Sequence, residues 1–217
     1  MQKTINTTWG KWLDADNWDV FATLNFGSLH LLEGNKIDSS AKIWRSCLST
    51  VDRALYGATR KAQPRFNRVV FKHYGDSGKN PHIHILAKAP INTDAFCIAL
   101  NAIWATQFDP TANPISNSIA PLITAKGATS YSQHEEFKDN TGAFDERLSY
   151  INLGDPHLVR EDALQRLHSK TAGIRLAQAR LALPIHIKTT QENFEKREKR
   201  EKRERRERMR VAALRRN

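Results

Sequence analysis

Three short segments of the chain are rich in the β-branched, aromatic and aliphatic residues that favour β-strands. The first covers residues 18–26 and is followed by Gly27. The second covers residues 68–74 and the third residues 82–87, and the segment between them is rich in Gly, Asp, Ser and Asn. Because such residues favour turns, the last two segments are predicted to pair as an antiparallel hairpin.

Two longer segments, residues 39–57 and 93–107, carry apolar residues at helical spacing. In the first of them Ser39 or Ser40 is the expected N-cap. Weaker patterns indicate a short strand at 119–125 and a short helix at 145–152. Strands and helices alternate along the chain, and residues 109–142 are otherwise loop-like.

A third long helix is predicted in the C-terminal part of the chain. Asp155 and Pro156 suit an N-cap and a first helical position, so the helix would begin there and run to about Ala182. Pro184 is expected to end it, because proline lacks the backbone N–H that a helix interior needs.

The order of these elements predicts an α+β fold, in which helices pack on the faces of an antiparallel sheet. Residues 1–190 are expected to form one compact domain. Residues 191–217 hold 12 Lys or Arg and 6 Glu, with Glu at repeated i,i+4 spacing from basic residues. This segment has too few apolar residues to enter a core, so it is predicted to be a solvated, charged helical tail.

The charge of the chain indicates a polyanionic partner. Lys and Arg number 34 against 23 Asp and Glu, which gives a net charge of +11 and a pI near 9.9. Only two cysteines are present, so no disulfide framework is expected and a reducing, cytoplasmic location is predicted. No apolar stretch is long enough for a membrane span, so no membrane partner is expected.

The pentapeptide Pro81-His82-Ile83-His84-Ile85 carries the most specific chemistry in the chain. Side chains alternate along a strand, so His82 and His84 share one face. In the predicted hairpin His73 lies near them and could add a third imidazole. Three nitrogen ligands with open coordination positions are typical of a catalytic metal site. Rival ligands for the third position are His157 and Glu135.

These motifs resemble those of the HUH endonuclease superfamily, and in particular its single-tyrosine initiators of rolling-circle replication. Residues 20–26, with the sequence VFATLNF, resemble the family's first motif, and the histidine pair resembles its second. The sequence around Tyr150, LSYIN, is similar to the start of the third motif, although Leu153 stands where the family usually has lysine. Tyr131, with Lys138 nearby, is the rival nucleophile.

The resemblance implies a metal-dependent endonuclease that nicks and joins single-stranded or hairpin DNA through a 5′-phosphotyrosine on Tyr150. It also implies Mn²⁺ or Mg²⁺ at His73, His82 and His84, a bacterial or mobile-element origin, and a helicase acting in trans. Basic residues near the motifs are the expected phosphate contacts: Arg65, Arg68, Lys72, Lys79 and Lys88.

Three alternatives remain open at this point. The first is an inactive relative of the same fold that binds a DNA hairpin, which the missing lysine at Leu153 favours. The second is a nicking transposase or relaxase with the same chemistry. The third is a histidine-triad nucleotide hydrolase, which Leu86 disfavours because a third alternating histidine is expected there.

Overall fold

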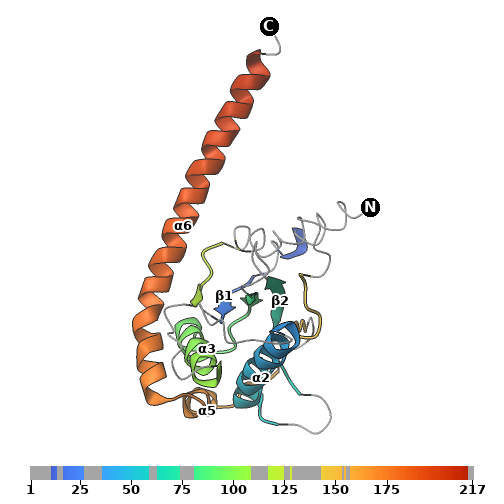
Figure 1. Ribbon diagram of the computed structural model, residues 1–217, viewed down its shortest axis with the longest axis vertical. Coiled ribbons are helices and arrows are strands. Elements are labelled where there is room, and N and C mark those ends of the chain that lie inside the picture. Colours follow the sequence, from blue (N-terminus) through green and yellow to red (C-terminus); the bar gives the residue numbers. More distant parts are fainter. Residues whose placement is uncertain are drawn as a thin grey trace.

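The computed structural model describes residues 11–13, 17–26, 36–58, 63–73, 81–108, 117–124, 128, 143–152, 154 and 157–214. Its centre is a four-stranded antiparallel sheet in the order β2-β3-β1-β4. The strands are β1 (Val20–Asn25), β2 (Arg68–His73), β3 (His82–Ala87) and β4 (Ser118–Pro121). The predicted α+β class is therefore confirmed (Figure 1).

Strand β3 lies in the interior of the sheet, between β2 and β1. The predicted hairpin is confirmed, and its register pairs Arg68 with Ala87 at one end and His73 with His82 at the other. Thr23 of β1 pairs with His84 on the other side of β3. Because paired residues project to the same face of a sheet, this register decides which side chains meet.

Helices α2 (Lys36–Tyr56) and α3 (Thr93–Phe108) cover one face of the sheet. Their apolar side chains pack on the alternate strand residues that include Val70, Ile83 and Ile85. Helix α2 begins three residues before the predicted N-cap, so Ser39 and Ser40 lie inside it. The predicted N-cap is therefore wrong, and Ser40 is instead a fully buried residue of the helix.

The opposite face of the sheet carries the histidines and a second, smaller apolar cluster. Its members include Trp18, Val69, Phe71 and Leu86. Trp18 is 6% exposed, and its indole N–H donates to the carbonyl oxygen of Leu13. Trp18 therefore packs in the core of this face and offers no free ring for stacking with a nucleobase.

The segment at 145–152 is extended and does not form the predicted short helix. Phe144 and Tyr150 form isolated β-bridges with Phe71 and Arg68, so the segment runs beside the free edge of β2. A tight turn lies between the bridges, because the Asp145 carboxylate accepts hydrogen bonds from the backbone N–H groups of Arg147 and Leu148. The spacing of apolar residues in this segment is compatible with a strand as well as with a helix. Pairing with β2 favours the extended backbone at the two bridges.

The C-terminal helices also differ from the prediction. Residues 157–160 are not helical, and the first helix there is α5 (Ala163–Ser169). It is followed by α6 (Gly173–Leu214), which contains Pro184 in its interior and does not end there. Pro184 is exposed, and the Glu, Lys and Arg residues that follow are strong helix formers, so the helix continues at the cost of a hydrogen bond.

Helix α6 packs its N-terminal part against α3 and β4, and the rest of it projects beyond the body of the molecule (Figure 1). Ion pairs at i,i+4 spacing support the projecting part, among them Glu198 with Lys202 and Arg200 with Glu204. No helix among the described residues combines the length and the apolar composition needed to cross a bilayer.

Candidate metal centre

Three histidines from two neighbouring strands converge on the sheet face that α2 and α3 leave open. His82 and His84 project from β3 to the same side, and His73 of β2 stands directly opposite His82 in the register. The ring centroids lie 5.3 Å apart for His73 and His82, 4.9 Å for His82 and His84, and 4.4 Å for His73 and His84. The expected cluster therefore forms, with His73 as its third member.

The cluster has the dimensions of a metal site. Each imidazole offers one nitrogen, and these three nitrogens lie within 4.8 Å of one another. A tetrahedral metal with histidine nitrogens at about 2.1 Å holds neighbouring nitrogens about 3.4 Å apart, so the three rings would move closer together on binding an ion. His73 and His84 are fully buried, whereas His82 is partly exposed. The open side of the cluster is therefore the side of His82.

Thr23 and Phe21 of β1 hold the ring of His84 in place. The Thr23 hydroxyl lies 2.9 Å from Nδ1 of His84, and the Phe21 ring stacks on the imidazole at a centroid distance of 5.6 Å. Because Nδ1 is engaged by Thr23, Nε2 is the nitrogen that His84 can present to a metal. A hydrogen bond of this kind fixes the tautomer and the orientation of a metal-binding histidine.

Replacing Thr23 by valine is therefore expected to weaken divalent-metal binding about 10-fold, because valine keeps the shape but removes the partner of His84 Nδ1. Titration of the variant with Mn²⁺ in a calorimeter measures this directly. Thr50→Val, in helix α2, is the matched control, because the Thr50 hydroxyl bonds only within and between helices. Equal affinities for wild type and Thr23→Val would contradict the role given to this hydroxyl.

The structure does not bring Tyr150 to the histidines. Tyr150 pairs with Arg68 at the far end of β2, five residues from His73, which is about 17 Å at the usual rise of a strand. It also projects to the other face, because its partner Arg68 reaches Asp52 of helix α2. Within one chain, the Tyr150 hydroxyl is therefore out of reach of a phosphate bound at the histidine cluster, contrary to the expectation from the motif.

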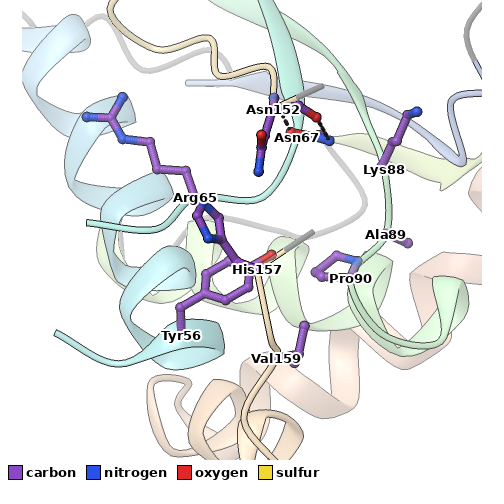
Figure 2. Close-up of a pocket in the computed structure, with 9 residues that line it drawn as sticks. All are labelled: Tyr56, Arg65, Asn67, Lys88, Ala89, Pro90, Asn152, His157 and Val159. Atoms are coloured by element: carbon purple, nitrogen blue, oxygen red, sulfur yellow. Dashed lines mark hydrogen bonds between the residues drawn. The ribbon is translucent and has the colours of Figure 1, made fainter. Parts of the chain in front are cut away.

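A separate pocket of about 260 Å³ is lined by Arg65 and His157 among others (Figure 2), and both of these residues contact Tyr150. The Tyr150 hydroxyl is 2.7 Å from Nε2 of His157, so His157 is a partner of Tyr150 and not a ligand of the histidine cluster. Tyr56 and His157 lie close together in the pocket, with ring centroids 5.8 Å apart. Burial raises the pKa of Tyr56 to about 12, so this phenol stays neutral at physiological pH.

Arg68, one of the expected phosphate contacts, has partners within the protein. Its guanidinium forms two hydrogen bonds to the Asp52 carboxylate, at 2.8 and 2.9 Å, and a third to the carbonyl oxygen of Leu148. Arg68 is 3% exposed and its donors face the protein interior. In this arrangement the guanidinium is engaged by Asp52 and Leu148, and the role of Arg68 as a DNA phosphate contact stays a prediction.

Three of the other predicted phosphate contacts lie within the described residues: Lys72, Arg65 and Lys88, the last of which lies over the ring of Trp18 on the histidine face. Lys72 projects to the helix side and forms an ion pair of 3.2 Å with Asp145. Arg65 and Lys88 line the pocket in Figure 2, where Arg65 lies 6.0 Å from the centre of the Tyr150 ring. Lys79 lies outside the described residues, as do Tyr131, Glu135 and Lys138.

Sequence reasoning missed the part that Thr23 and Phe21 play at the centre. Both residues stand in the first motif, and period-two alternation placed them on one face of the strand. The missing information was the register of β1 against β3, which no local pattern gives. Comparisons of the chain with protein-family models, curated proteins and solved structures found no match.

Proposed function

We propose that this protein is a divalent-metal-dependent endonuclease that nicks and rejoins single-stranded DNA, of the kind that initiates rolling-circle replication. The observation that carries the proposal is the convergence of His73, His82 and His84 on the sheet face opposite α2 and α3. The net charge of +11 suits a polyanionic substrate. The order of the first two motifs along the chain, residues 20–26 and then the histidine pair, supports the same reaction class.

The histidines are suited to hold Mn²⁺ or Mg²⁺, with Mn²⁺ the better match for three imidazoles. When bound, such an ion withdraws charge from a phosphodiester and stabilises the negative charge that develops during attack. The chain supplies the remaining requirements. The imidazoles of His73 and His84 are buried, and the Thr23 hydroxyl orients the ring of His84. His82 is the partly exposed member of the cluster.

The nucleophile in this proposal is a tyrosine that reaches the histidine face. Tyr150 does not meet this condition within one chain, because it projects to the other face of the sheet. Tyr131, the rival nucleophile from the sequence, lies outside the described residues. We therefore favour Tyr131 over Tyr150 as the residue that forms the phosphotyrosine.

The test is incubation of the protein with labelled single-stranded oligonucleotides and Mn²⁺, followed by denaturing electrophoresis. We expect cleavage and a covalent protein–DNA band for wild type and Tyr150→Phe. Tyr131→Phe should lose the band, because phenylalanine has no hydroxyl to attack phosphorus. His82→Ala should lose cleavage and band together, whereas His168→Ala in helix α5 serves as the control for loss of a histidine elsewhere.

Two results would contradict the proposal in different ways. A covalent band that is lost only in Tyr150→Phe would return the nucleophile to Tyr150 and imply that two chains share one site. DNA binding without cleavage, across a broad pool of oligonucleotides and with Mn²⁺ or Mg²⁺ present, would instead identify the protein as an inactive DNA-binding relative.

A further inference from the structure

A groove of about 470 Å³ borders the histidine centre on the side of helix α6. Phe21 and Thr23 of β1 form part of one wall, and α6 supplies the other wall with Thr190, Asn193, Phe194 and Arg197. Pockets of this size hold small ligands or single units of a larger one. Neither the sequence motifs nor the proposed metal site accounts for these residues of α6.

The groove and the metal centre share two side chains. Thr23 contacts Nδ1 of His84 at 2.9 Å, and Phe21 stacks on the same imidazole. Both residues also line the groove. A polymer whose phosphate lies at the histidines would therefore have a neighbouring unit close to the groove.

The α6 wall has the chemistry that a nucleotide needs. Phe194 is half-buried and offers an aromatic surface for a base, and stacking of this kind tolerates any base. Thr190 and Asn193 add a hydroxyl and an amide that can bond sugar and phosphate oxygens. Arg197 also lines the groove and supplies a positive charge there that can attract a phosphate.

We propose that this groove binds one nucleotide of the single strand, next to the phosphate held at His73, His82 and His84. In this arrangement Phe194 contacts the base and Arg197 contacts a backbone phosphate. Helix α6 is then a substrate-binding element, not only a solvated tail. The inference rests on the proposed function, because it takes single-stranded DNA as the substrate.

The test measures binding of a fluorescein-labelled single-stranded oligonucleotide by anisotropy, in EDTA and at a series of salt concentrations. We expect Phe194→Ala to weaken binding about 10-fold, because a stacking surface is lost. Arg197→Ala should weaken binding and lower the salt dependence by about one phosphate contact. Arg200→Ala is the matched control, since Arg200, like Arg197, pairs with a glutamate four residues later but does not line the groove.

Thr190→Val provides a second variant that keeps the shape of the wall and removes a hydroxyl, and thermal melting of all variants confirms that they fold. Unchanged affinity in both Phe194→Ala and Arg197→Ala would overturn the proposal that the groove binds a nucleotide, even if the wild type binds and cleaves DNA. An equal loss in Arg197→Ala and Arg200→Ala would also overturn it, because charge alone would then explain binding. A wild type that neither binds nor cleaves the single strand would overturn the proposed function itself.

Discussion

Replacing His84 by alanine is expected to abolish tight binding of divalent metal and, with it, DNA cleavage. His84 lies close to both of the other histidines, with ring centroids 4.4 Å from His73 and 4.9 Å from His82. Its loss leaves two imidazoles on the sheet face and removes the contact with Thr23. Because loss of a residue that only orients a ligand already costs about 10- to 100-fold in metal affinity, loss of the ligand itself should cost more than about 100-fold.

Calorimetric titration with Mn²⁺ measures this loss independently of any DNA substrate. His84 is fully buried, so the variant also needs a melting curve to show that it folds. His82→Ala is the companion variant, because His82 is partly exposed and its truncation leaves a smaller cavity. His168→Ala should bind metal as the wild type does. Retention of wild-type affinity in folded His84→Ala and His82→Ala would show that the cluster is not a metal centre.

The sheet and the histidine cluster could be predicted because both follow from short-range patterns. Alternation on a strand places His82 and His84 on one side, and the turn-rich segment before them predicts the hairpin. The hairpin register then pairs His73 with His82. Each step uses residues close together in the sequence, so little depends on the rest of the fold.

The placement of Tyr150 could not be obtained in this way. The sequence around it has apolar residues that suit either a short helix or an extended edge segment. Pairing with Arg68, which is 82 positions earlier in the chain, selects the extended form and turns the side chain toward α2. The five-residue motif around Tyr150 does not contain that information, whereas the segment of the hairpin includes both of the strands that pair.

The end of helix α6 was also not predictable from a local rule. Proline usually ends a helix, and that rule predicted a stop at Pro184. The residue lies on an exposed side of the helix, and the following turns are composed of strong helix formers with i,i+4 ion pairs, such as Arg200 with Glu204. The local penalty at one residue is therefore outweighed by the favourable propensity of many. As a result, Phe194 and Arg197 of the helix line the groove together with Phe21 and Thr23 of β1.

Arg68→Ala is expected to lower the free energy of unfolding by about 3–5 kcal/mol, the usual cost of leaving one buried charge without its partner. Asp52 is 1% exposed and would lose both hydrogen bonds from the guanidinium. The carbonyl oxygen of Leu148 would lose its bond to Arg68 Nε, so the edge segment that carries Tyr150 should loosen as well. Urea unfolding followed by circular dichroism measures the change.

A double variant separates this structural role from a role in DNA binding. Asp52→Leu combined with Arg68→Met removes both charges and fills the space with apolar groups, so it should recover much of the stability that Arg68→Ala loses. Arg65→Ala, at a partly exposed position on the pocket of Tyr56 and His157, should leave the free energy of unfolding almost unchanged. If Arg68→Ala instead kept its stability and lost affinity for DNA, the guanidinium would have to leave Asp52 to meet a phosphate. The buried ion pair would then be a latent binding group and not a fixed part of the core.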